Sequence, residues 1–310
     1  MKNIFYILPF LLISFIAKGQ NYTEEEIKIN TPYQTIHGTL VQPNSKANSL
    51  VIIIPGSGPT DRNGNNVMAK NNSLKYLAEG LVENSIASFR YDKSVLTLNP
   101  TDTLVLKALR FEHFIEEAKA VIHHFKKQNK YGKIVVAGHS QGSLVGMLAS
   151  KNNADAFISI AGAGRSIDEV IIDQIAANSP MFKGEVERVL NELKKGNLVN
   201  DYNPLLASLF NIKTQPFLMS WMAYNPQEEI ANLAIPVLLI NGTKDIQVAV
   251  NEAKLLHNKC ENSEIKIIEN MNHVLKIIEG NTSENIASYS NPNLDVSSKL
   301  IEIISNFINE

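Results

Sequence analysis

The chain has 310 residues, of which 44% are hydrophobic and 19% are charged, so it can bury a large core and is not composed like a disordered protein. Its formal net charge is −2, and its lysines and arginines are dispersed, which gives no support for nucleic-acid binding. The single cysteine, Cys260, excludes a framework of intrachain disulfides and a thiolate metal site.

Residues 1–19 have the organisation of a secretory signal peptide. Lys2 provides a positive start, residues 4–17 are mostly apolar, and small residues precede a cleavage site near Gly19-Gln20. An uncleaved membrane anchor is the alternative, but the apolar stretch is shorter than the ~20 residues that span a bilayer. We therefore expect an exported protein, periplasmic or extracellular, with no stable membrane anchor.

After this segment, short apolar runs alternate with amphipathic stretches of helical length, beginning with an antiparallel pair of strands at 24–30 and 34–41. This alternation predicts an α/β fold with a mostly parallel central sheet and helices on both faces. Further strands are expected at 50–54, 85–91, 133–137, 156–160, 236–240 and 264–268. Helices are expected at 73–83, 111–127, 140–150, 248–258 and 296–308.

The alternation breaks at residues 165–232, where amphipathic and apolar-aromatic segments follow one another without a strong strand signal. We interpret this stretch as a helical cap, inserted above the carboxyl ends of the strands into a core made of residues 20–164 and 233–310. Helical decoration packed beside the sheet is the alternative. Aromatic and methionine side chains of the cap are first of all core residues. Those that we expect to line a substrate pocket are Phe217, Trp221 and Met222.

The pentapeptide Gly-His-Ser-Gln-Gly at 138–142 follows the apolar strand 133–137 and precedes the apolar stretch 143–149. This is the form of a nucleophile elbow, in which a tight turn holds a serine hydroxyl, here that of Ser140, exposed at a helix N-terminus. Small residues on either side let the helix pack against the strand, and the helix end favours a developing anion. A glycine-rich turn with a capping serine is the alternative.

A serine hydroxyl is a poor nucleophile near neutral pH, so it needs a base and a carboxylate that orients the base. Asp245 and His273 each follow a predicted strand, which places both at the same sheet edge as Ser140. Taken singly, Asp245 could cap the next helix and His273 could be a surface residue. Their joint placement favours a Ser-His-Asp triad.

Other titratable residues suit these roles less well. His257 lies within a helical pattern, which makes it a poorer base, and His139 precedes the nucleophile, where it would shape the elbow. Glu269 is the reserve acid, although its closeness in sequence to His273 makes it less suitable than Asp245.

A tetrahedral intermediate also needs N–H donors for its oxyanion. The amide of Gln141, directly after the nucleophile, is the first candidate. The second is expected in the glycine-rich loop 55–62, with the amide of Ser57 first and that of Gly58 in reserve. This loop has neither a P-loop sequence nor a complete Gly-x-Gly-x-x-Gly pattern, so nucleotide binding is not expected. The predicted chemistry requires no metal and no organic cofactor.

These motifs resemble the α/β-hydrolase superfamily, and within it the bacterial serine aminopeptidase-like and esterase-like hydrolases with a helical cap. The resemblance rests on the loop 55–62, Arg-Tyr-Asp-Lys at 90–93, the elbow, Gly-Thr-Lys-Asp at 242–245 and Asn272-His273, and it covers nearly the whole mature chain. The family often continues 90–93 with arginine and glycines, whereas this chain has Ser-Val-Leu, a departure that concerns the pocket rim. A structural polar cluster is expected from Asp61, Arg62, Arg90 and Asp92.

The residues and the resemblance together predict a secreted serine hydrolase, most simply a carboxylic ester hydrolase that forms an acyl-enzyme and takes a small-molecule ester. A peptidase or amidase with the same triad is the main alternative, and an aminopeptidase would need acidic residues to hold a substrate ammonium. A non-catalytic binding protein of the same fold is a further alternative. Acidic candidates in the predicted cap are Asp168, Glu169, Asp173, Glu228 and Glu229.

Overall fold

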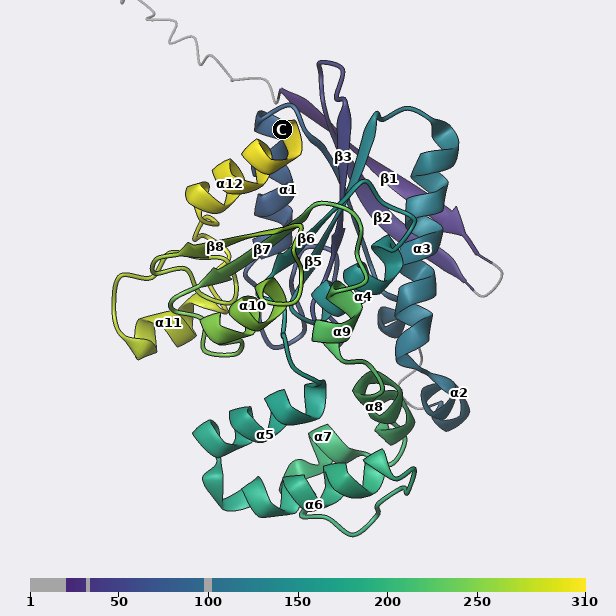
Figure 1. Ribbon diagram of the computed structural model, residues 1–310, viewed down its shortest axis with the longest axis vertical. Coiled ribbons are helices and arrows are strands. Elements are labelled where there is room, and N and C mark those ends of the chain that lie inside the picture. Colours follow the sequence, from purple (N-terminus) through teal and green to yellow (C-terminus); the bar gives the residue numbers. More distant parts are fainter. Residues whose placement is uncertain (1–20, 32–33, 98–101) are drawn as a thin grey trace, which may run out of the picture.

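The structure is a computed structural model that describes residues 21–31, 34–97 and 102–310. The strands of the described chain are β1 (Tyr22–Asn30), β2 (Thr35–Pro43), β3 (Ser49–Ile54), β4 (Ala87–Tyr91), β5 (Lys133–His139), β6 (Ala156–Ile160), β7 (Val237–Gly242) and β8 (Ser263–Ile268). They form one sheet in the order β1-β2-β4-β3-β5-β6-β7-β8 (Figure 1). β2 runs antiparallel to β1 and to β4, and all other neighbours are parallel.

Helices cover both faces of this sheet, so the predicted architecture is confirmed. Those of the core are α1 (Ser73–Glu83), α2 (Thr103–Ala108), α3 (Phe111–Gln128), α4 (Gln141–Ser150), α10 (Val250–His257), α11 (Thr282–Ser288) and α12 (Ser298–Asn309). Leu50, Ile52 and Ile54 of β3 belong to the apolar cluster shared with α3 and α4. Val51 and Ile53 belong to the cluster shared with α1 and α12. Because successive strand side chains point to opposite faces, a continuous apolar run is what a strand covered on both sides requires.

The predicted strands and the longer predicted helices are all present, with differences at their ends. β4 begins at Ala87 instead of Ser85, because Ser85 takes a positive φ of 62° in the turn that follows α1. The sequence patterns do not predict α2, α11 or the helix α9 (Pro226–Ile230), which have only 6, 7 and 5 residues. Such short helices show no full apolar period.

Between β6 and β7 the chain is helical, as the sequence predicts. Its elements are α5 (Ile167–Asn178), η2 (Pro180–Phe182), α6 (Lys183–Lys194), η3 (Pro204–Leu206), α7 (Ala207–Phe210), α8 (Gln215–Met222) and α9. They bury an apolar cluster of their own around Val186, Leu190 and Phe210. In Figure 1 the helices α5, α6 and α7 form a layer below the sheet, and α8 lies between them and α3. We call residues 165–232 the helical insertion.

The predicted signal peptide, residues 1–19, and its cleavage site lie outside the described residues. Within the described ranges, no helix combines the length and the apolar character that crossing a membrane requires.

Candidate active site

Ser140 occupies the sharp turn between β5 and α4, at the carboxyl end of a central strand. Its φ of 55° and ψ of −120° are strained for a residue with a side chain, at a cost of about 1–3 kcal/mol. The tight packing around it needs glycine on both sides. A Cβ on Gly138 would lie 2.1 Å from the Gly142 carbonyl oxygen, and one on Gly142 would lie 2.4 Å from the Ile54 carbonyl oxygen. The pentapeptide therefore sits in the strand-turn-helix context of a nucleophile elbow.

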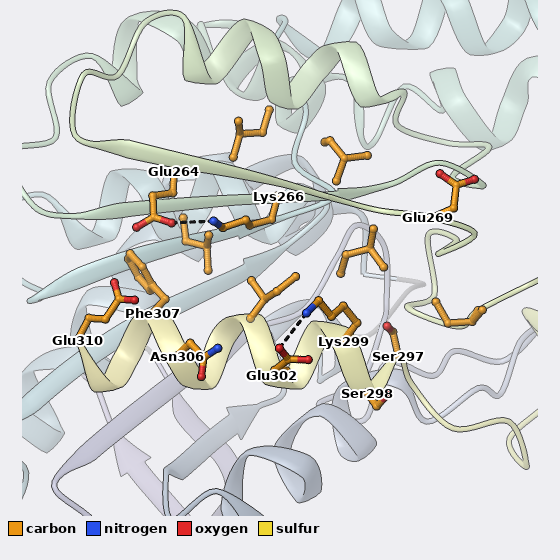
Figure 2. A pocket seen from close by; sticks show the side chains of 16 residues that line it. Glu264, Lys266, Glu269, Ser297, Ser298, Lys299, Glu302, Asn306, Phe307 and Glu310 are labelled. Atoms are coloured by element: carbon orange, nitrogen blue, oxygen red, sulfur yellow. Dashed lines mark hydrogen bonds and ion pairs between the residues drawn. The ribbon is translucent and has the colours of Figure 1, made fainter.

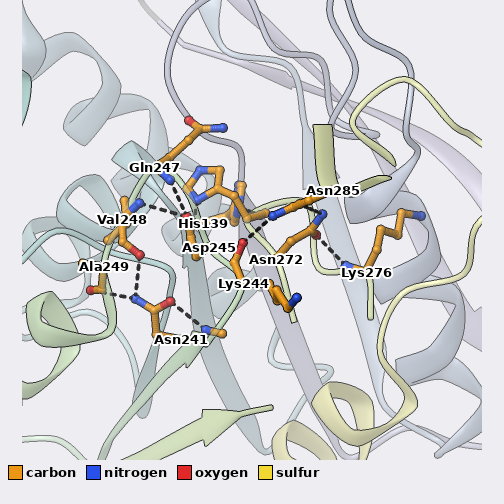
Figure 3. A network of polar contacts seen from close by, with 12 residues as sticks. His139, Asn241, Lys244, Asp245, Gln247, Val248, Ala249, Asn272, Lys276 and Asn285 are labelled. Atoms are coloured by element: carbon orange, nitrogen blue, oxygen red, sulfur yellow. Dashed lines mark hydrogen bonds and ion pairs between the residues drawn. The ribbon is translucent and has the colours of Figure 1, made fainter. Parts of the chain in front are cut away.

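Asp245 and His273 form a buried hydrogen-bonded pair. Nδ1–H of His273 donates to Oδ2 of Asp245 at 2.8 Å, and the side chains of His273 and Asp245 are 5% and 1% exposed. Oδ1 of Asp245 accepts the backbone N–H groups of Gln247 and Val248, both at 2.8 Å (Figure 3). One carboxylate therefore caps the turn before α10 and also orients the imidazole. With its proton on Nδ1, the ring keeps a lone pair on Nε2, as a general base requires.

Buried amide side chains tie the loop of Asp245 to the loop of His273. Asn272 Nδ2 donates to Asn285 Oδ1 at 2.8 Å. Asn285 Nδ2 in turn donates to the carbonyl oxygen of Lys244 at 2.7 Å (Figure 3). Because the side chains of Asn272 and Asn285 are buried and hydrogen-bonded, they hold the loops of Asp245 and His273 at a fixed separation.

His139 links the elbow to the loop of His273. Its Nε2–H donates to the carbonyl oxygen of His273 at 2.8 Å, and the centroids of the two rings are 4.8 Å apart. Burial, together with the neighbouring His273, lowers the pKa of His139 to about 3, so this ring is neutral at physiological pH. His139 thus ties the strand end that leads to Ser140 to the loop that carries His273.

The reactive atoms of Ser140 and His273 have no hydrogen-bond partner in the described structure. Among the described residues, the Ser140 hydroxyl makes no hydrogen bond, and Nε2 of His273 makes none either. Ser140 is half-buried and His273 is buried. Catalytic hydrogen bonds are often long in a structure without substrate and shorten only when substrate binds. The two residues therefore lie on segments that His139 links, with no hydrogen bond between their side chains in the described structure.

The loop after β3 packs directly against the elbow. A Cβ on Gly56 would lie 3.3 Å from Ser140 Cβ and 3.4 Å from His139 Nδ1, so glycine is what makes this approach unstrained. The backbone N–H groups of Ser57 and Gln141 have no hydrogen-bond partner in the described part of the chain. Gly58, the reserve donor, has a φ of 72° and open space beside it. Two backbone N–H groups without a partner therefore lie next in sequence to residues at the elbow, Ser57 after Gly56 and Gln141 after Ser140.

The other candidates for acid and base lie elsewhere. Glu269 lines a groove between β8 and α12, shown in Figure 2, whereas the Nδ1 atom of His273 is bonded to Asp245. His257 is at the end of α10, where its Nδ1 lies 2.8 Å from the hydroxyl of Ser263. Within the described ranges, no three His, Cys, Asp or Glu side chains are grouped so that they could hold a metal ion.

The predicted pocket residues are half-buried on α8 and its end. Trp221 stacks on Phe111 of α3 at a centroid distance of 5.6 Å, and Phe217 packs against Phe114 at 5.4 Å. Met222 packs on the insertion's own apolar cluster. These contacts join the insertion to the core through an aromatic cluster. Contact of these side chains with a substrate stays a prediction.

The four residues of the expected polar cluster hold the loop after β3 in place. Arg62 donates to Asp92 Oδ2 at 2.6 Å from one guanidinium nitrogen and at 2.9 Å from another. Arg90 pairs with Glu24 at 3.1 Å. Asp61 Oδ1 accepts two backbone N–H groups of its own loop, at 2.8 and 2.9 Å. Of these contacts only the one between Arg62 and Asp92 joins two of the four residues, while Arg90 is tied to β1 and Asp61 to its own loop.

Lys93 is the residue of this region to which the sequence assigns no role. It follows Asp92 at the end of β4, is only 1% exposed, and points inward. Its Nζ donates to the carbonyl oxygen of Gly56 at 2.5 Å and to Oε1 of Gln141 at 3.0 Å. The only signal for it in the sequence is its place in the Arg-Tyr-Asp-Lys motif at 90–93.

Comparison with known proteins relates the chain to hydrolases. The profile of the family described as "serine aminopeptidase, S33" matches residues 70–277, a range that contains Ser140, Asp245 and His273. Esterase EstD of Thermotoga maritima is 26% identical in an alignment of 275 positions that covers 85% of this chain. The chain spans 63% of the length of that relative.

Solved structures of esterases share the fold. Est1E from Butyrivibrio proteoclasticus superposes with a TM-score of 0.59 at 16% identity, over 92% of this chain and 99% of that one. The Pyrococcus furiosus esterase Pf2001 superposes with a TM-score of 0.56 at 15% identity, over 97% of this chain and 98% of that one. At these identities the likeness concerns the fold, and it confirms the α/β-hydrolase architecture.

Proposed function

We propose that the chain, which belongs to the serine aminopeptidase family (S33) of α/β hydrolases, hydrolyses carboxylic esters through an acyl-enzyme on Ser140. The observation that carries the proposal is the buried 2.8 Å bond between Asp245 and His273, held beside a strained serine elbow. An acid that fixes the tautomer of a histidine next to such a serine is the arrangement that activates a hydroxyl nucleophile.

In the proposed reaction, Nε2 of His273 takes the proton of Ser140 while Oγ attacks the carbonyl carbon of the ester. The N–H groups of Ser57 and Gln141 hold the tetrahedral oxyanion. When the intermediate collapses, the carbon–oxygen bond to the alcohol breaks and His273 gives its proton to the leaving oxygen. Water then attacks the acyl-enzyme with His273 as base, and the carboxylic acid leaves. Ser140 recovers its proton, so the enzyme is unchanged.

Three features favour an ester over a peptide as the substrate. Two of the five acidic candidates in the insertion for holding a substrate ammonium already form ion pairs, Asp168 with Lys194 and Asp173 with Arg165 at 2.7 Å. The aromatic side chains of α8 instead offer apolar surface, which suits an acyl or aryl group. The curated relative and the structural neighbours described above carry esterase names.

The helical insertion is proposed to cap the site, because it leaves the sheet directly after β6, next to the strand that delivers Ser140. Export through a signal peptide over residues 1–19 belongs to the same proposal and rests on the sequence alone. An exported enzyme of this kind would act on esters outside the cytoplasm.

Turnover of p-nitrophenyl acetate and butyrate, compared with that of aminoacyl-p-nitroanilides, tests the proposal. The wild type should hydrolyse the esters faster than the anilides, and Ser140→Ala should lower ester turnover by ~10⁴ to 10⁶-fold with the fold intact. Faster anilide turnover would transfer the assignment to a peptidase. Ester hydrolysis that survives in Ser140→Ala would remove the triad from the mechanism.

A further inference from the structure

Lys93 is buried where a lysine is not expected. Lysine is almost never fully buried unless it is paired, yet Lys93 is 1% exposed, with its Nζ 4.7 Å from the centroid of the Phe114 ring. The ammonium donates two hydrogen bonds, to the carbonyl oxygen of Gly56 and to Oε1 of Gln141. Both acceptors belong to segments that carry a proposed oxyanion donor.

The bond to Gly56 controls the direction of the Ser57 N–H. The two groups belong to one trans peptide unit, in which C=O and N–H point in opposite directions. Lys93 therefore holds the Gly56 oxygen on the inner side of the loop, so that the Ser57 N–H faces away from it. The ammonium group of Lys93, which donates to the Gly56 carbonyl oxygen, also draws electron density from the peptide unit. This makes the Ser57 N–H of the same unit a stronger donor.

The bond to Gln141 acts on the other donor. Gln141 is the first residue of α4, and its side chain is 5% exposed. Its backbone N–H has no partner among the described residues, while its side-chain oxygen accepts from Lys93 at 3.0 Å. One side chain thus connects the loop after β3 with the start of α4.

The surroundings of Lys93 do not suggest a role in stability. Glu117 of α3 is the acidic group that faces it, but the two are not within ion-pair distance in the described structure, and Ser94 N–H donates to Glu117 Oε2 at 3.2 Å. Burial lowers the pKa of Lys93 to about 7 and raises the pKa of Glu117. An apolar side chain at this position would avoid the cost of burying an amine.

We propose that Lys93 is a positioning residue of the oxyanion hole, which orients the Ser57 and Gln141 N–H groups towards the substrate oxygen through its bonds to Gly56 and Gln141. This inference rests on the proposed serine-hydrolase function. Lys93 does not contact the reacting atoms. It acts through two backbone groups that do.

Lys93→Met removes both hydrogen bonds and keeps the length and apolar stem of the side chain. It should lower kcat for p-nitrophenyl acetate by about 10²-fold, the scale of losing an oxyanion donor, with KM changed by less than about threefold. Lys133→Met is the matched control, because Lys133 also donates to a backbone carbonyl, that of Ile308 at 2.8 Å. Lys133 lies at the start of β5, whereas Ser140 follows the end of this strand. Its kcat should equal that of the wild type.

A thiono ester, in which sulfur replaces the carbonyl oxygen, separates positioning from general damage. Sulfur is a weak hydrogen-bond acceptor, so the wild type should prefer the oxygen ester, and Lys93→Met should lose most of that preference. An equal loss on both esters would show that Lys93 only supports the fold. If Lys93→Met does not fold, Gln141→Leu keeps the Gln141 backbone N–H and removes one acceptor of Lys93, and it should lower the same preference.

The two proposals fail in distinguishable ways. An unchanged kcat in folded Lys93→Met, with Ser140→Ala inactive, would overturn the role of Lys93 and leave the proposed function standing. A wild type that neither turns over esters nor reacts with a fluorophosphonate would overturn the function, and the role of Lys93 with it.

Discussion

The core and the helical insertion hold their functional side chains in different ways. In the core, Asp245 and His273 are fixed by short hydrogen bonds and Ser140 by a strained turn between glycines. In the insertion, Phe217 and Trp221 are held by aromatic packing against α3. Hydrogen-bond geometry is lost when one partner changes, whereas apolar packing tolerates swaps that keep volume. Changes in the core should therefore affect the chemical step, and changes in the insertion should affect substrate preference.

Apart from replacement of Ser140, Asp245→Asn should cause the largest loss of kcat. The amide keeps an oxygen for the Gln247 and Val248 N–H groups, so the turn before α10 should survive. Its NH₂ group cannot accept the proton on Nδ1 of His273, which favours the wrong tautomer. We expect kcat to fall by ~10³ to 10⁴-fold with the melting temperature little changed. Activity within tenfold of the wild type would mean that another acid orients His273.

His139→Gln tests the link between the elbow and the base through its pH dependence. The pKa of His139 is about 3 in the folded protein and 6.5 in its ordinary state, because burial and His273 disfavour the charged ring, while Asp245 opposes the shift. Between these values the unfolded chain binds one more proton than the folded one. The free energy of unfolding should therefore fall as pH drops from 6.5 to 3, by up to ~1.4 kcal/mol per unit.

In His139→Gln this contribution is absent, so its unfolding free energy, measured by urea denaturation across the same pH range, should fall less steeply than that of the wild type. Equal slopes would show that His139 is not neutral in the folded protein. At pH 7 the ratio of turnover of p-nitrophenyl butyrate to that of the acetate should be the same in the two proteins, because His139 lies in the core.

Trp221→Ala should have a smaller effect, and of another kind. Removing a half-buried indole should lower the free energy of unfolding by about 2 kcal/mol and raise KM for butyrate more than for acetate, with kcat for acetate within about threefold. Tyr224→Phe is the control, because it keeps the ring in the same aromatic cluster and removes only the 2.9 Å bond to Glu112. A large loss of acetate kcat in folded Trp221→Ala would contradict the division between core and insertion.

The fold could be predicted from the sequence wherever an apolar period persists along an element. β3 is apolar at consecutive positions because both of its faces are covered, and the helix predicted at 73–83 agrees with α1 because its apolar period is complete. The turn that delays β4 to Ala87 depends on the left-handed conformation of Ser85, which no period reveals. Short helices such as α9 are set by capping and packing, and their apolar residues are too few to show a pattern.

Those residues of the candidate site that follow predicted strands, in the chain order of the motif, could be predicted from the sequence. The sequence places Asp245 ahead of Glu269 as the partner of His273, and the folded chain shows that Asp245 makes the bond. Lys93 could not be predicted, because lysine is exposed by default and its inward orientation depends on acceptors 37 and 48 residues away in sequence. The apolar-aromatic segment of the insertion predicts Phe217 as a pocket residue, and its packing against α3 is a tertiary contact that no local pattern reveals.

Labelling of the full chain with a fluorophosphonate, followed by mass spectrometry of its peptides, tests the central claim most directly. One phosphonylated residue, Ser140, is expected in the wild type, and no labelling is expected in Ser140→Ala. Labelling that persists in the variant, or a folded wild type that does not react, would contradict an activated Ser140. The second result would favour a binding protein that has the α/β-hydrolase fold without its catalysis.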